Sequence, residues 1–184
     1  MDPRRSLPWF AAAAALGTVH AAASLYWALG GDALSATVGE WAVSWRAESP
    51  LSAGLALGVI GVGKLAGAWV PWVAARGGGP RHGLRIAAWL GAVLLVGYGL
   101  ANTLAANLAL TGVLGPVGDL AATRGHAWLW DPLFLLWGLA LAAGLRRSRG
   151  RRTVPEGTVR RPEPVGDAPM VGQAGEGPCS RSRY

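Results

Sequence analysis

Charged side chains are scarce in this sequence: they make up 15% of the 184 residues, whereas about 25% is usual for soluble proteins. The last 39 positions hold nine of the 17 basic residues and four of the ten acidic ones. The excess of positive charge therefore belongs to a tail, which excludes a folded basic domain that reads nucleic acid. The remaining 145 residues are too rich in apolar side chains to form a disordered chain.

Cysteine and the motifs of common enzymes are also missing. The single cysteine, Cys179, lies in the tail, so there is no disulfide framework and no Cys-x-x-Cys redox pair. The sequence has no Gly-x-Ser-x-Gly elbow, no His-Glu-x-x-His and no phosphate-binding glycine loop. A bis-histidine haem needs two deeply placed histidines, and only His20 lies deep in an apolar segment. We therefore expect no metal or cofactor, and the sequence favours a non-enzymatic protein.

Four long apolar segments are what the sequence does contain. Each can cross a hydrocarbon core of about 30 Å, which takes about 20 helical residues. Ser49-Pro50 is typical of a helix start, and Gly115-Pro116 is typical of a helix end. The predicted fold is all-α, an integral membrane bundle of four antiparallel helices within residues 8–145 that follows a short N-terminus, residues 1–7. The predicted spans are residues 8–29, 51–75, 84–114 and 127–145.

Arginine is distributed unevenly around these segments. Fourteen of the 16 arginines lie on one side, and only Arg46 and Arg124 lie on the other. Because positive residues stay on the cytoplasmic side, we expect a multi-pass protein of the cell membrane with both termini cytoplasmic. Nine of the ten tryptophans fall near segment ends, as in the aromatic belts of membrane interfaces. Arg4-Arg5 before an Ala-rich run also resembles a secretory signal, but the apolar stretch through Leu29 is longer than a usual signal core.

The predicted first outer loop, residues 32–49, has a helical pattern of its own. Its large apolar residues recur every three or four positions and so share one helical face. These residues are Leu34, Val38, Trp41 and Trp45. We expect a short amphipathic helix that either lies on the outer leaflet or packs on the mouth of the bundle.

The tail, residues 146–184, is rich in Gly, Pro, Arg and Ser and is predicted to be disordered. Five arginines stand at its start, within Arg146–Arg152. We interpret this cluster first as a topology signal, and second as a site that attracts anionic lipid. Nucleic acid is not an expected partner, because the tail has no aromatic residues interleaved with its basic ones.

Two ionisable side chains fall inside the predicted spans, where a charge costs about 2.5–3.5 kcal/mol. His20 and Lys64 each lie near the middle of their predicted spans. Both therefore come near the bilayer midplane, even though the two spans are antiparallel. Candidate polar neighbours are Ser24, Tyr98 and Asn102. With no carboxylate at this depth, we expect His20 to be neutral and the amine of Lys64 to reach a hydrogen-bonding group of another span.

These residues support two hypotheses about function. In the first, a non-enzymatic membrane protein binds a lipid, a small amphiphile or a partner helix within the bundle, around Lys64. In the second, a small transporter or proton-coupled permease uses His20 and Lys64, although the first two spans do not visibly repeat in the last two. Simple interhelical hydrogen bonding is the alternative for His20. A homo-oligomer is also left open.

A second group of ionisable residues gathers at the predicted outer rim. It comprises Asp32, Glu40, Arg124, His126 and Asp131. Because Asp131 precedes Pro132, we interpret it as the N-cap of the last helix, a contact worth about 1 kcal/mol. The alternative is a carboxylate that lines the outer mouth of the bundle.

Three short motifs resemble a known family. His20-Ala-Ala-Ala-Ser24-Leu-Tyr26-Trp27-Ala-Leu-Gly30-Gly31 precedes Thr37-Val-Gly39-Glu-Trp41-Ala-Val, and Asp131-Pro132-Leu133 opens the last span. They resemble the small, mainly actinobacterial four-span membrane proteins grouped as the domain of unknown function 3995, over about residues 8–145. The resemblance implies an integral protein of the bacterial inner membrane and assigns no reaction.

Overall fold

The structure, a computed structural model, describes residues 5–77 and 80–148. All regular secondary structure in these two ranges is helical, which confirms the all-α prediction. Four helical stretches there are long and apolar enough to cross a membrane, so the chain is a multi-pass membrane protein. They are α1 (Leu7–Ala28), α3 (Pro50–Arg76), α4 (His82–Leu110) and a stretch from Leu120 to Arg147. The predicted disordered tail lies outside the described residues, apart from 146–148.

The last stretch is built from three pieces. α5 (Leu120–Gly125) leads through a π-helical turn (His126–Trp130) into α6 (Asp131–Arg147). The N-cap of the whole stretch is Asp119, whose carboxylate accepts a hydrogen bond of 2.9 Å from the backbone N–H of Ala122. The interpretation of Asp131 as an N-cap is therefore wrong, because the backbone is already helical ahead of it.

The loop between α1 and α3 contains a 3₁₀ turn (Ser35–Thr37) and one short helix, α2 (Glu40–Glu48). Gly39, with a φ of +136°, separates the two. The short helix expected in this loop is present, but the predicted face of four apolar residues is not continuous. Only Trp41 and Trp45 lie on α2, because the other two members precede the break at Gly39.

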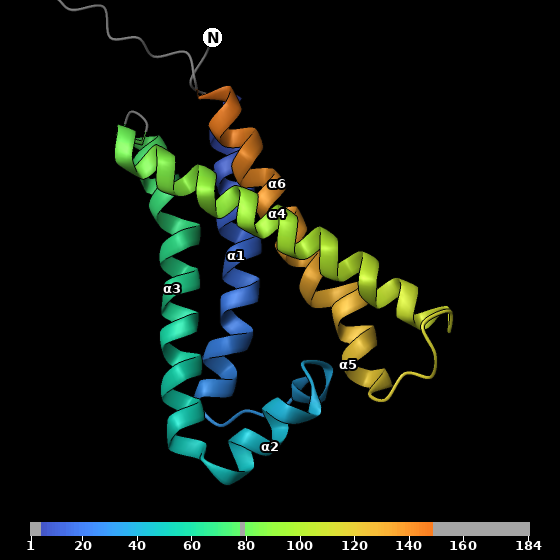
Figure 1. The fold of residues 1–184 in the computed structure, drawn as a ribbon. Coiled ribbons are helices and arrows are strands. Elements are labelled where there is room, and N and C mark those ends of the chain that lie inside the picture. The colour runs from blue at the N-terminus through green and yellow to red at the C-terminus, as the bar shows by residue number, and fades with distance from the viewer. Residues whose placement is uncertain (1–4, 78–79, 149–184) are drawn as a thin grey trace, which may run out of the picture. The chain divides into compact units, whose positions relative to one another are not determined.

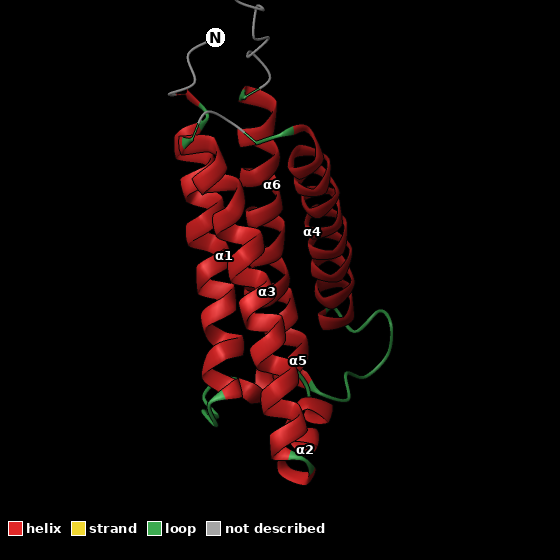
Figure 2. Cartoon of the chain, turned by 90° about the vertical axis from the view of Figure 1, so that its left-hand side faces the viewer, coloured by secondary structure: helices red, strands yellow, loops and turns green. Residues whose placement is uncertain are grey.

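The contacts between the long helices follow the order α3, α1, α6, α4, and Figure 1 shows that α4 runs obliquely across the others. α1 packs against both α3 and α6, and α4 packs along α6, whereas α3 and α4 touch only sparsely. Packed neighbours run in opposite directions, as predicted for an up-and-down bundle. Figure 2 shows α2 at the end of the bundle opposite the start of α1.

Glycine lets α4 approach the backbone of α6 closely. A Cβ atom on Gly99 of α4 would lie 2.5 Å from the backbone N of Leu135 and 2.7 Å from the carbonyl O of Asp131. A Cβ on Gly138 of α6 would in turn lie 2.9 Å from the backbone N of Val96. Small residues at such crossings are typical of helix packing in membranes.

One end of the bundle, which we call the arginine-rich end, carries six arginines and no acidic residue among those that the structure describes. These arginines are Arg5, Arg76, Arg81, Arg85, Arg146 and Arg147. The guanidinium of Arg85 donates to the carbonyl of Leu145 and, at 2.9 Å, to Oγ of Ser148. These bonds tie the start of α4 to the end of α6.

Candidate functional site

Lys64, the only lysine of the chain, extends from α3 toward α1. Its amine donates a hydrogen bond of 2.8 Å to Oγ of Ser24 and lies 3.1 Å from Nδ1 of His20. His20 and Ser24 are one helical turn apart on α1, so both reach α3 from the same face. Both are shielded, with exposed fractions of 5% and 2%. The predicted contact between Lys64 and another span is therefore present.

Two aromatic residues of the last span enclose His20. The ring centroid of Phe134 lies 3.9 Å from that of His20, and the centroid of Trp130 lies 5.6 Å away. The amine of Lys64 is 5.5 Å from the Phe134 centroid, within the range of a cation–π interaction. We call these residues, Lys64, His20, Ser24 and Phe134, the Lys64 cluster.

The hydrogen bonding of His20 depends on the state of Lys64. An ammonium group has donors only, so with charged Lys64 the Nδ1 atom of His20 accepts and Nε2 carries the ring proton. Nε2 is buried and has no hydrogen-bond partner among the described residues. The cluster is therefore not fully satisfied by protein groups within the described part of the chain.

The other two predicted pocket residues do not reach the amine. Tyr98 of α4 is 56% exposed, and its ring meets Phe134 edge-on at 5.7 Å. Tyr98 thus borders the cluster through Phe134. Asn102 is half-buried on α4, and both hydrogen-bond contacts of the Lys64 amine in the described structure go to α1 instead.

A cavity of about 510 Å³ opens beside the Lys64 cluster, between α3 and α4 and against α6. We call it the α3–α4 cavity. It exists because α3 and α4 touch only sparsely, and small residues such as Gly67 and Gly91 line both of its sides. Lys64 is the one ionisable residue among the described residues that line it. Trp137 also lines it, and its buried Nε1–H has no partner among the described residues.

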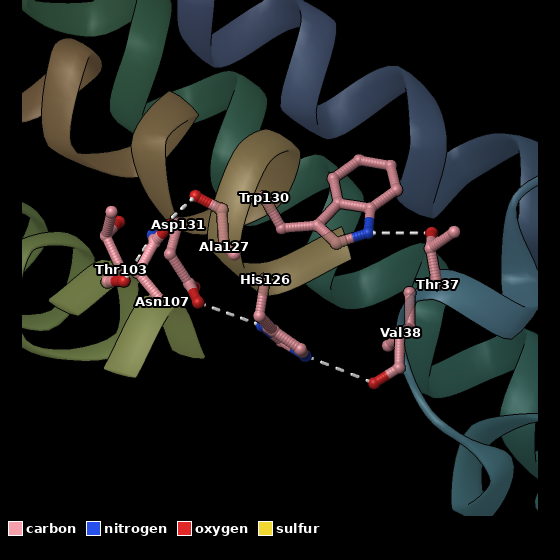
Figure 3. Close-up of polar contacts among 8 residues, drawn as sticks. All are labelled: Thr37, Val38, Thr103, Asn107, His126, Ala127, Trp130 and Asp131. Carbon is pink, nitrogen blue, oxygen red and sulfur yellow. Dashed lines mark hydrogen bonds and ion pairs between the residues drawn. The ribbon is translucent and has the colours of Figure 1, made fainter. Parts of the chain in front are cut away.

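A second polar site joins the outer loop to the π-helical turn (Figure 3). Nδ1 of His126 lies 2.9 Å from Oδ2 of Asp131, and Nε2 lies 3.2 Å from the carbonyl O of Val38. A carbonyl can only accept, so Nε2 carries a proton. The short contact at Nδ1 then requires another proton, held either by an imidazolium or by a neutral carboxyl group. Asp131 is 1% exposed, so water does not reach this contact from its side.

Trp130 connects this second site to the Lys64 cluster. Its Nε1–H donates a hydrogen bond of 3.0 Å to Oγ1 of Thr37, while its ring packs on His20. Gly125 permits the close approach, because a Cβ atom there would overlap Thr37. We call the contacts of His126, Asp131 and Trp130 with residues 37–38 the loop latch.

Asn107 and Pro132 meet at the π-helical turn that forms part of the latch. In the π register the carbonyl of Ala127 would pair with the backbone nitrogen of residue 132, which is a proline and has no N–H. The side-chain amide of Asn107 on α4 donates to that carbonyl instead, at 3.3 Å (Figure 3). A polar residue on a neighbouring span thus replaces the missing donor.

The predicted outer rim does not form one cluster. Asp32 and Arg124 are exposed and do not take part in the loop latch. Glu40 is also exposed, and its backbone N–H donates a hydrogen bond of 3.2 Å to Oδ2 of Asp119. Among the described residues, no three His, Cys, Asp or Glu side chains lie close enough to hold a metal ion.

Sequence reasoning missed Phe134 and the loop latch. Phe134 gives no separate signal, since an aromatic residue in an apolar span is ordinary. For the latch, the available signal is Asp131 itself, a carboxylate placed one residue before a proline inside an apolar stretch.

A family model described as "Protein of unknown function (DUF3995)" matches residues 17–141, which include the whole Lys64 cluster and the loop latch. Neither a curated protein nor a solved structure matches the chain. The matched segment covers more than half of the chain and runs from α1 into α6, and the chain is therefore a member of the DUF3995 family of membrane proteins.

Proposed function

We propose that this protein binds a small anionic amphiphile in the α3–α4 cavity, with the acidic head group at Lys64. The observation that supports this is a single cation in the wall of an otherwise apolar cavity of about 510 Å³. Cavities of about 300–1,000 Å³ are the usual size for small ligands, which are held by apolar walls and a few polar groups.

The charge balance of the cavity favours an anionic head group. An ammonium group away from water needs a counter-charge or several acceptors. Lys64 contacts one hydroxyl, one imidazole nitrogen and one aromatic face, and no acidic residue of the described ranges lines the cavity. A carboxylate or phosphate would supply the missing negative charge, and its apolar chain would lie against residues such as Leu94 and Leu95.

Lys64→Met is expected to remove the bound amphiphile without unfolding the protein, because methionine keeps the length of the side chain and removes the donor. The protein would be purified with native lipids in mild detergent, and co-purifying molecules identified by mass spectrometry. Lys64→Arg, which keeps the charge, serves as the control and is expected to retain the ligand. An unchanged ligand together with raised thermal stability in Lys64→Met would show that Lys64 is only a tolerated charge.

The contact between Lys64 and His20 favours a second candidate function, a proton-coupled permease. Two titratable groups in contact on adjacent spans are a common arrangement in proton relays. Proteoliposomes that contain a pH-sensitive dye would distinguish the two functions. Proton flux that Lys64→Met abolishes would favour the permease, and ligand binding without flux would favour the binding protein.

We also propose that both termini are cytoplasmic and that the protein lies in the cell membrane. The six described arginines at one end and the acidic residues toward the other support this orientation. A reporter that is active only outside the cytoplasm is expected to work after Leu29 and Gly118 and to fail after Gly79 and Arg152. Activity after Gly79 or Arg152 would contradict the orientation.

A further inference from the structure

We propose a second ligand site, a groove between α4 and α6 that binds one anionic phospholipid of the leaflet at the arginine-rich end. The groove has a volume of about 830 Å³. It lies on a different face of α4 from the α3–α4 cavity, and we call it the α4–α6 groove. Its lining includes Trp89, Val93 and Gly97 of α4 and Leu139, Ala143 and Arg146 of α6.

Two guanidinium groups border the groove at the end of α6. Arg147 lines the groove beside Arg146, and its guanidinium lies 4.5 Å from the centre of the Trp9 ring. Stacking on an aromatic ring occupies the face of a guanidinium but leaves its N–H edge able to donate to phosphate. Arg146 is exposed. The bonds from Arg85 to the carbonyl of Leu145 and to Ser148 hold this end of α6 in place.

The remaining lining of the groove is apolar and follows the two spans away from the arginine-rich end. From Arg147 to Leu139 the helix rises about 12 Å, so the groove extends about two turns below the arginines. This arrangement matches a lipid whose phosphate meets the two arginines while one acyl chain lies in the groove. Basic pockets between spans are known to bind acidic head groups. Because no described acidic residue lies at this end, the lipid that fits carries net negative charge.

Titration of the purified full chain in mild detergent, followed by native mass spectrometry, tests the head-group requirement. Phosphatidylglycerol is compared with phosphatidylcholine of identical acyl chains, and one tightly bound phosphatidylglycerol per chain is expected. The double variant Arg146→Gln with Arg147→Gln is expected to weaken the binding of phosphatidylglycerol about 30-fold. Arg76→Gln with Arg81→Gln removes the same charge at the same end but outside the groove, and is expected to change the affinity less than about 3-fold.

Two glycine variants on the same helix test the requirement for the groove. A Cβ atom on Gly97 or on Gly91 would have no atom within 4 Å, so a leucine side chain starts in open space at either position. Gly97→Leu fills the α4–α6 groove and is expected to lose the phosphatidylglycerol. Gly91→Leu fills the α3–α4 cavity and is expected to keep it, so that the test does not depend on any ligand at Lys64.

Three results would each contradict the proposed phospholipid site in the α4–α6 groove. Equal binding of phosphatidylcholine would remove the head-group requirement. If Arg76→Gln with Arg81→Gln weakened phosphatidylglycerol binding equally, the lipid would be attracted by the general positive charge of this end and not by the groove. Unchanged binding in Gly97→Leu would show that the arginines hold the head group without an acyl chain in the groove. If the Arg146 and Arg147 pair does not fold, the glycine variants and the lipid comparison still decide the question.

Discussion

Gly99→Ala is expected to lower the free energy of unfolding by about 3 kcal/mol, the upper end of the range for overpacked cores. The added Cβ would lie 2.5 Å from the backbone N of Leu135, 3.0 Å from its Cα and 2.7 Å from the carbonyl O of Asp131. All three are backbone atoms of α6, which cannot rotate away as a side chain can. α4 would therefore have to move from α6 as a whole. Unfolding in mixed detergents with rising dodecyl sulfate measures the loss.

Gly97→Ala is the matched control, since it places the same methyl group two residues away on the same helix. No atom lies within 4 Å of a Cβ there. Because alanine favours helix more than glycine does, this variant is expected to be as stable as the wild type or up to about 1 kcal/mol more stable. Equal stability of the two variants would contradict the backbone contact between α4 and α6.

The four spans and the contact of Lys64 with α1 could be predicted from the sequence. Length and hydropathy are sufficient to predict the membrane-spanning helices, because a helix that crosses lipid must be apolar over about 20 residues. The depth of Lys64 in its span was sufficient to predict its contact with α1, because residues near the middle of two antiparallel spans lie at the same depth in the membrane. His20 and Ser24 then followed as partners, since they lie one turn apart on one face.

The order of the helices around Lys64 could not be predicted in the same way. In a membrane span nearly every face is apolar, so hydropathy does not tell which face meets protein and which meets lipid. Tyr98 and Asn102 were at a suitable depth, but Phe134 of α6 lies beside Lys64 where one of them was expected. The α3–α4 cavity depends on the same choice, because it exists only where α3 and α4 do not close on each other.

The loop latch could not be predicted either, because it depends on a helical register. A regular helix start at Pro132 would leave Asp131 as a cap, which was the interpretation from sequence. The π-helical turn extends the helix toward the N-terminus, Asp131 is buried beside it, and Asn107 of another span donates to one of its carbonyls. A local pattern carries no information about that distant donor.

Asp131→Ala is expected to lower the free energy of unfolding by about 3 kcal/mol. Leaving one partner of a buried hydrogen bond unsatisfied costs about 1–3 kcal/mol, and the upper end applies because the Asp131 side chain is 1% exposed. The loss leaves Nδ1 of His126 without its partner and loosens residues 37–38 from the π-helical turn. Unfolding in mixed detergents measures the stability, and hydrogen exchange at residues 34–39 is expected to accelerate with it.

Asp131→Asn separates the hydrogen bond from the charge. The asparagine amide can donate to Nδ1 of a neutral His126, whose Nε2–H still donates to the carbonyl of Val38, so no additional proton is needed. This variant is therefore expected to lose less than about 1 kcal/mol. A double-mutant cycle of Asp131→Ala with His126→Ala is expected to show a coupling energy of about 2 kcal/mol, since the two side chains are in direct contact. Equal losses in the asparagine and alanine variants, or a coupling near zero, would mean that the latch is not held by this hydrogen bond.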